Sequence, residues 1–265
     1  MDVRVGCEFV FESDAAAPSV FQVQPHRSAG NILRSEVWRF SPALEARDYH
    51  DSFDNSCHRV EIPEGNLTAR YDAVVEVSGD PERQDPGVAQ VPVGELPPEV
   101  LHFTLPSRYC LSDVLSGAAI DLFDALEPGW GQVQSVCDWV HEHIAYSIGS
   151  STPLTDATHV YMARQGVCRD LTHLAISFCR ALNYPARYVF GYLPLLGSPL
   201  PEEGMDFAAW MEVYLDGGWY TFDPRNNQPR AGRVLIGRGR DAVDVAMVTS
   251  AGSPRLLSMN VWADA

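Results

Sequence analysis

The chain changes its hydrophobic period part of the way along, and this change predicts two kinds of structure. In the first eighty residues, short runs rich in β-branched and aromatic residues are separated by Pro, Gly, Asn and Asp, a pattern typical of antiparallel strands joined by turns. The predicted strands are residues 3–10, 20–23, 36–40, 59–62 and 71–77. We predict an N-terminal antiparallel β domain over residues 1–80, with a structural or substrate-positioning role.

Helical periodicity begins after a segment with no period. Residues 81–100 carry Asp, Pro, Gly and Gln without repeating apolar positions, which is typical of a linker. Apolar residues three and four positions apart then predict helices. These helices cover residues 112–126, with Ser112 or Asp113 as the cap, then 130–144, 153–165 and a stretch that begins at Cys168.

Strand character returns after the last predicted helix. Asp216, Gly217 and Gly218 separate two β-rich runs, as in a hairpin. The predicted strands are residues 186–192, 210–215, 219–222, 233–236, 242–248 and 256–262. We predict an α+β fold in which residues 101–265 form a second domain of helices packed on an antiparallel sheet.

Composition narrows the choice of partners. The 265 residues are 46% hydrophobic, enough for a sizeable core, and 19 basic against 35 acidic residues give a net charge of −16. This charge disfavours binding to nucleic acid or to an anionic membrane. We see no signal segment and no run of roughly 18 apolar residues, so we expect no membrane span and a cytoplasmic location.

One of the six cysteines differs from the others in its context. None has paired spacing, so we interpret five as buried small hydrophobes; these are Cys7, Cys57, Cys110, Cys137 and Cys179. Cys168 opens a predicted helix, where unpaired N–H groups and the helix dipole favour a thiolate. We expect a nucleophile with a pKa below the ordinary value of about 8.5. No Cys–His spacing typical of zinc occurs, so we predict no metal and no cofactor.

The order of several motifs resembles the transglutaminase-like superfamily, and more narrowly its bacterial cysteine proteins. The resemblance covers residue 101 to the C-terminus and, more weakly, the first hundred residues. Its motifs are residues 106–110, 137–140, 185–188 and 237–241, Gly166-Val167-Cys168-Arg169-Asp170, and Asp206-Phe207-Ala208-Ala209-Trp210. It implies a transglutaminase- or papain-like core with a catalytic triad. Cys168 is then the nucleophile, Asp223 the acid, and residue 208 the position of the histidine.

Ala208 departs from the family pattern. An imidazole normally takes the thiol proton and protonates the leaving group, which a methyl group cannot do. Three hypotheses remain open: a working enzyme with an altered triad, a catalytically silent protein that binds a ligand, and a histidine exchanged for alanine to stop turnover. His159 and Asp223 are the candidates for a substitute base, whereas His173 is predicted to point away from Cys168.

The expected activity is cysteine-dependent acyl transfer. Cys168 would attack an amide or thioester carbonyl, and water or an amine would take the acyl group from a small-molecule, peptide or carrier-bound substrate. Trp210 and Trp219 are expected to wall the site, and Arg225 to bind a substrate carboxylate or phosphate. The loop at residues 193–205 is expected to carry specificity. The sequence predicts no oligomeric state.

Overall fold

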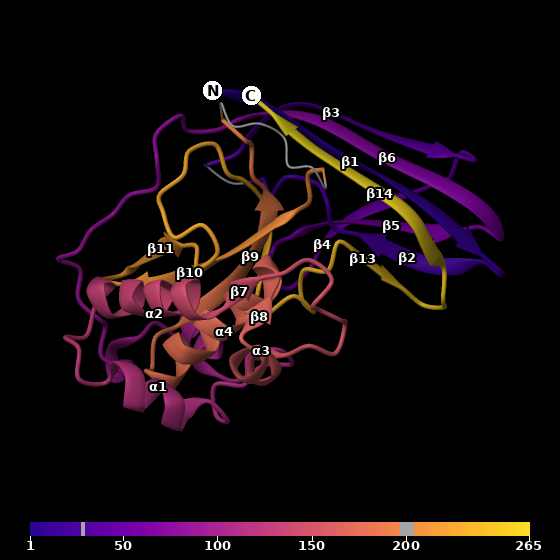
Figure 1. Cartoon of the computed structure of the whole chain (residues 1–265). Coiled ribbons are helices and arrows are strands. Elements are labelled where there is room, and N and C mark those ends of the chain that lie inside the picture. Colours follow the sequence, from indigo (N-terminus) through magenta and orange to yellow (C-terminus); the bar gives the residue numbers. More distant parts are fainter. Residues whose placement is uncertain (28–29, 197–203) are drawn as a thin grey trace.

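The computed structural model describes residues 1–27, 30–196 and 204–265 (Figure 1). Within these residues the strands form three four-stranded antiparallel sheets and one short parallel pair. The first sheet has the order β14 (Arg255–Asp264), β1 (Asp2–Ser13), β6 (Gly65–Glu76), β3 (Ile32–Ser41). The second has the order β13 (Val248–Ser250), β2 (Ala17–Phe21), β5 (Ser56–Ile62), β4 (Arg47–His50).

The third sheet, here called the core sheet, carries the helices. Its order is β11 (Gly218–Phe222), β10 (Ala208–Leu215), β9 (Ala186–Tyr192), β12 (Val234–Gly239). The parallel pair is β7 (Ala145–Tyr146) with β8 (Gln165–Gly166). The α-helices are α1 (Ser116–Phe123), α2 (Trp130–His143), α3 (Ala157–Ala163) and α4 (Cys168–Ala181), and the segment before α1 contains the 3-10 helices η1 (Val93–Glu95) and η2 (Pro98–Thr104). The predicted α+β class, with helices on an antiparallel sheet, is confirmed.

Several predicted elements differ from the structure in bounds or in kind; the helix predicted at residues 153–165, for example, covers only Ala157–Ala163. Residues 242–247 form turns instead of a strand, because the Asp241 carboxylate accepts the N–H of Val243 and the Asp241 carbonyl accepts the N–H of Asp244. Such local bonds favour a turn over an extended strand. The first helix starts at Ser116 instead of near Ser112, and its cap residue Leu115 makes no side-chain hydrogen bond.

The two N-terminal sheets take strands from both ends of the chain. β14 pairs with β1 in antiparallel register from Arg4–Asp264 onward, and β13 pairs with β2. The two termini therefore lie side by side (Figure 1). The division into residues 1–80, 81–100 and 101–265 stays a prediction, since the last strand of the chain completes the first sheet.

The N-terminal sheets hold the segment that enters β10. The Phe207 ring stacks on Phe9 of β1, with centroids 6.3 Å apart, and packs at a tilt against Phe190 of β9, with centroids 4.8 Å apart. Two residues before Phe207, Met205 forms an isolated β-bridge with Val261 of β14. Aromatic burial of this kind is a large part of core stability. The backbone at residues 205–207 is thus positioned by strands from both ends of the chain.

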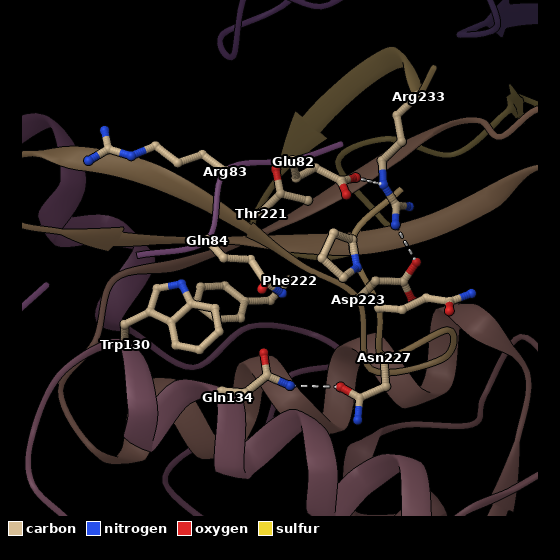
Figure 2. A pocket seen from close by; sticks show the side chains of 12 residues that line it. Glu82, Arg83, Gln84, Trp130, Gln134, Thr221, Phe222, Asp223, Asn227 and Arg233 are labelled. Atoms are coloured by element: carbon tan, nitrogen blue, oxygen red, sulfur yellow. Dashed lines mark hydrogen bonds and ion pairs between the residues drawn. The ribbon is translucent and has the colours of Figure 1, made fainter. Parts of the chain in front are cut away.

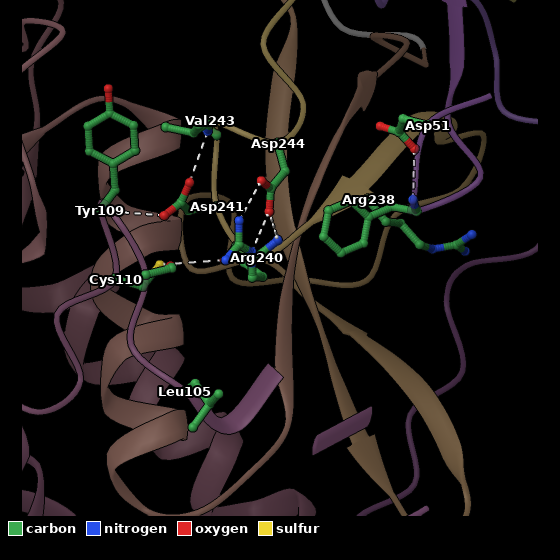
Figure 3. Close-up of polar contacts among 12 residues, drawn as sticks. Asp51, Leu105, Tyr109, Cys110, Arg238, Arg240, Asp241, Val243 and Asp244 are labelled. Atoms are coloured by element: carbon green, nitrogen blue, oxygen red, sulfur yellow. Dashed lines mark hydrogen bonds and ion pairs between the residues drawn. The ribbon is translucent and has the colours of Figure 1, made fainter. Parts of the chain in front are cut away.

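Two motifs far apart in the sequence meet beside α4 (Figure 3). The Asp241 carboxylate accepts the backbone N–H groups of Tyr109 and Val243, both at 2.9 Å. Arg180, only 2% exposed, donates hydrogen bonds to three carbonyl oxygens, those of Leu105, Ala186 and Arg240. These bonds join the segments 105–110 and 237–241 to the C-terminal half of α4.

His173 of α4 is buried, and its ring lies against Tyr109, Tyr188 and Ala242. Its Nε2 accepts the N–H of Ala242 at 3.2 Å, and its ring lies 5.0 Å from the rings of both Tyr109 and Tyr188. Burial, together with the charges of Arg169 and Arg180, holds the pKa of His173 well below its ordinary value of 6.5. The side chain is therefore neutral in the folded protein at neutral pH.

We expect this histidine to weaken the fold in acid. Because its pKa is lower in the folded than in the unfolded state, its contribution is complete above pH 6.5 and is lost as the pH falls. The loss is about 1.4 kcal/mol per pH unit. Urea unfolding between pH 4.5 and 7.5 should show a shallower acid decline in His173→Gln, whose amide can still accept the Ala242 N–H. Parallel pH curves for the two proteins would contradict this assignment.

Within the described ranges, the helices are all too short or too polar to cross a membrane.

Candidate active site

The start of α4 is built by three neighbours of Cys168. Asp170 is fully buried, and its Oδ2 accepts the N–H of Val167 at 3.0 Å, which closes the first turn. A Cβ at Gly166 would lie 2.8 Å from the Asp170 Cβ, so this position requires glycine. Arg169 donates to Asp170 Oδ1 and to the carbonyl of Thr152. These contacts hold Cys168, half-buried, as the first residue of the helix.

The thiol lies against the edge of β10 that faces β11, at a point where β11 does not reach. Cys168 Sγ is 4.0 Å from the carbonyl oxygen of Phe207, and the N–H of Ala209 donates to the sulfur. The pairing of β11 with β10 begins only at Met211–Phe222, so β11 leaves this edge of residues 207–209 open. Cys168 occupies the place that a longer β11 would take. Residue 208 lies between the two backbone groups that contact the thiol.

The side chain of Ala208 packs on the face of the core sheet opposite α4. It is 7% exposed and clusters with Val189, Trp210 and Leu235. The neighbouring Ala209 and Met211 belong instead to the large core that includes α4. Alternation along the strand produces this difference. The position that the family resemblance assigns to a histidine thus holds a buried methyl group and no proton-accepting atom.

The charges around Cys168 oppose one another. Burial raises the pKa of its thiol; the Arg225 guanidinium and the Ala209 N–H lower it, and the carboxylates of Asp206 and Asp223 raise it. The result is a pKa above the ordinary value, the reverse of what the helix start alone predicted. A reaction at neutral pH therefore requires a group that removes the thiol proton.

Asp223 is committed to other partners. It directly follows β11, and its Oδ1 accepts the N–H groups of Arg225 and Asn226, each at 3.0 Å. Its Oδ2 accepts the side-chain amide of Asn226 at 2.7 Å and Arg233 Nη2 at 2.8 Å. A carboxylate has about four lone-pair sites. Both oxygens are thus occupied, which disfavours the hypothesis that Asp223 itself acts as the base.

A small cavity lies beside Asp223 (Figure 2). Trp130 and Gln134 of α2 line it together with Phe222, and Arg233 bridges Asp223 to Glu82 from the segment before α1. Its volume is about 30 Å³, enough for one water molecule and too small for a substrate. The contacts in Figure 2 therefore support Asp223 and do not form a substrate cleft.

The three predicted substrate-binding residues separate in the structure. Trp210 is 3% exposed and lines a cavity of about 450 Å³ with Glu212 and Arg238, on the sheet face away from α4. Trp219 lies at the far end of β11, four residues or about 13 Å along the strand from Asp223. There it stacks under Arg187, whose Cζ is 3.8 Å from the ring centroid. This placement favours packing roles for both tryptophans.

Arg225 is the predicted binding residue that lies near the thiol. Its charge acts on Cys168, and its Cζ is 4.1 Å from the centroid of the Tyr146 ring. Among the described residues it has no ion-pair partner, unlike Arg233, Arg238 and Arg240. Its guanidinium is thus available to stabilise a thiolate or to hold an anionic group of a substrate.

No histidine takes the place of the missing imidazole in the described part of the chain. The His159 side chain is 69% exposed and its Nδ1 lies 2.8 Å from Asp156, which caps α3. No histidine is among the groups that act most strongly on the Cys168 thiol. Asp206, which is among them, stands in the 206–210 motif and had no predicted role.

Two further predictions concern metal binding and the loop at residues 193–205. The described residues contain no cluster of three His, Cys, Asp or Glu side chains placed to hold a metal ion. Part of the predicted specificity loop, residues 197–203, lies outside the described ranges.

Comparison with known proteins relates the chain to one family. Residues 121–224 match the family model of the transglutaminase-like superfamily. The chain is 30% identical to the crystal structure of a putative cysteine protease from Cytophaga hutchinsonii, with a TM-score of 0.91 over 99% of this chain and 90% of that one. It is also 30% identical over 217 residues to the Mycobacterium tuberculosis (strain ATCC 25618 / H37Rv) protein Rv2569c. The matched region covers 76% of this chain and 69% of that protein. The chain belongs to the transglutaminase-like superfamily.

Proposed function

We propose that the protein is a cysteine-dependent acyltransferase or hydrolase that forms an acyl-thioester on Cys168. The placement of Cys168 carries this proposal. It is the first residue of α4, half-buried instead of enclosed, and its sulfur lies at the open edge of β10. The other five cysteines are buried, as expected for residues that only pack.

The surroundings suit a tetrahedral intermediate. At the start of α4 the N–H groups of Asp170 and Leu171 already donate to the Val167 carbonyl, so those of Cys168 and Arg169 are the ones that would serve an oxyanion beside Cys168. The positive charge of Arg225 would stabilise the thiolate before attack. The carbonyl carbon then bonds to Sγ, the leaving group departs, and water or an amine takes the acyl group.

Ala208 favours a particular kind of donor. In the family pattern the residue at this position would protonate the leaving group, which an amine needs and a thiolate hardly needs. We therefore propose a thioester donor ahead of an amide, on a small-molecule, peptide or carrier-bound acyl group. A cytoplasmic location also stays a prediction.

A catalytically silent binding protein is the second candidate. The methyl group at residue 208 and the full hydrogen bonding of Asp223 favour it, since both deprive the thiol of the usual triad partners. In this case the surface around Cys168 would bind a peptide or small molecule without turnover.

Acylation by a phenyl thioester separates the two candidates. We expect the intact mass of the protein to rise by one acyl group, located on Cys168 by peptide mapping, with no adduct in Cys168→Ser. Cys179→Ser, which alters a buried cysteine on the same helix, should acylate like the parent protein. Absence of an adduct, or an adduct on another cysteine, would reject the acyl-transfer candidate in favour of binding alone.

A further inference from the structure

We propose that the cavity on the face of the core sheet away from α4 binds a small molecule that carries an oxyanion, a carboxylate or a phosphate. Its volume is about 450 Å³, and small-molecule sites in proteins measure roughly 300–1,000 Å³. Trp210, Glu212 and Leu235 of the core sheet line it, together with residues from the segments 77–82 and 230–233. Binding there does not involve Cys168, so this site is additional to the proposed acyl-transfer site.

Two carboxylates in the cavity wall already have partners. Both oxygens of Glu212 accept hydrogen bonds from the Arg238 guanidinium, at 2.9 and 3.2 Å. Glu82 is engaged in the same way, because its Oε1 accepts Arg233 Nε and its Oε2 accepts the backbone N–H of Arg230. A ligand in the cavity would therefore meet the remaining N–H groups of the arginines as donors, rather than these two carboxylates as acceptors.

Arg233 is firmly held and retains one unpaired donor. Its side chain is 8% exposed; Nε donates to Glu82 and Nη2 to Asp223 (Figure 2). Its Cζ lies 4.8 Å from the centroid of the Trp210 ring, which fixes the plane of the guanidinium. Among the described residues, the buried Nη1 has no hydrogen-bond partner. A buried donor without an acceptor costs free energy, and a ligand oxygen bound against Arg233 would supply that acceptor.

Arg230 brings a second cation to the same cavity. In the described part of the chain its side chain forms no ion pair, and its one hydrogen bond is a long contact of 3.4 Å from Nη2 to the Pro194 carbonyl. Its backbone is anchored, since its N–H donates to the Glu82 carboxylate and its carbonyl accepts the Glu82 N–H at 3.3 Å. The third carboxylate of the wall, Asp80, is exposed, so water and salt screen its charge.

These groups select the chemistry of the ligand. Guanidinium groups present their N–H donors in a fixed fork that matches the oxygens of a carboxylate or a phosphate. Arg230 and Arg233 lie three residues apart and line one cavity, each with N–H groups that the protein leaves unused. An oxyanion would accept from both arginines, whereas a neutral or cationic molecule would leave these donors unpaired.

Calorimetric titration at pH 7.5 tests the site with three probes: glutarate, inorganic phosphate and glutaramide, the neutral counterpart of glutarate. We expect saturable binding of at least one of the two anions and none of glutaramide. Tighter binding of glutarate would assign the site to carboxylates, and tighter binding of phosphate to phosphates. If neither anion bound saturably, or if glutaramide bound as well as glutarate, the proposal would be wrong.

Variants and chemical modification then locate the binding. We expect Arg230→Met to weaken binding of the anion about tenfold or more, as for the loss of a charge-assisted hydrogen bond. Arg34→Met, which removes an exposed arginine on β3, should bind like the parent protein. Cys168→Ser should also bind like the parent, so the result is independent of acyl transfer.

The parent protein provides a readout that requires no variant. The bound anion should slow the modification of Arg230 by phenylglyoxal, measured by peptide mapping, and leave the modification of Arg34 unchanged. Equal modification of Arg230 with and without the anion, or equal affinity in Arg230→Met and the parent, would place the binding elsewhere and overturn the assignment of this cavity.

Discussion

Replacing Ala208 by histidine is expected to raise the rate of Cys168 acylation about 10²-fold at neutral pH, the lower end of what general acid–base catalysis provides. Residue 208 lies between the two backbone groups that contact the thiol, the Phe207 carbonyl and the Ala209 N–H, but its side chain points to the sheet face opposite α4. The effect therefore requires the imidazole to reach the thiol around the edge of β10 that β11 leaves open. An imidazole there, with a pKa near 6.5, accepts a thiol proton more readily than a carboxylate does. Single-turnover acylation by a phenyl thioester measures the effect.

Ala208→Gln is the matched control, because it adds a polar side chain of similar reach that does not titrate. The histidine variant should exceed it by most of the 10²-fold gain. Equal rates for the histidine and glutamine variants would mean that an imidazole at residue 208 does not reach the thiol.

The second large effect is on stability, at Arg180. Its side chain makes five hydrogen bonds, to Leu105, Ser107, Ala186 twice and Arg240. Replacement by methionine leaves several buried carbonyl oxygens without a donor. Each unsatisfied group costs about 1–3 kcal/mol. We expect Arg180→Met to lower the free energy of unfolding by about 3–5 kcal/mol, read from urea unfolding at pH 7.5.

Arg34→Met is the control for this experiment. Arg34 pairs with Glu76 on the surface and its side chain is 54% exposed, so its loss should cost only about 0–1 kcal/mol. If Arg180→Met lowered the free energy of unfolding no more than Arg34→Met, the hydrogen bonds of the buried guanidinium would only offset the cost of removing its charge from water. The joining of segments 105–110 and 237–241 would then rest on Asp241 and on the contact of Cys110 Sγ with the Arg240 carbonyl.

Local signals were sufficient for the elements that carry the site. The hairpin of β10 and β11 turns at Asp216 and Gly217, which both have positive φ values, 43° and 78°, as a tight hairpin turn requires. The helix start at Cys168 follows from its apolar period and from Gly166 and Asp170. Each depends on residues within a few positions, so the sequence predicts it without knowledge of distant segments.

Distant contacts decided what no local pattern encodes. The pairing of β14 with β1 joins residues more than 240 positions apart, and a β-rich run alone does not name its partner. Likewise Asp241, whose oxygens bond Tyr109 and Val243, turned a predicted strand into a turn. Propensity describes a half-buried surface and leaves open which segment covers it.

The chemistry of the site divides in the same way. By itself the sequence determined that Cys168 opens a helix and that residue 208 has no acid or base, because both are properties of single positions. Only the tertiary structure decided that burial outweighs the helix start and raises the thiol pKa. It also decided that the Asp223 carboxylate is occupied, since Arg233, 10 residues further along the same connection from β11 to β12, folds back onto it. Desolvation and hydrogen-bond partners are set by packing, and packing is determined by the whole chain.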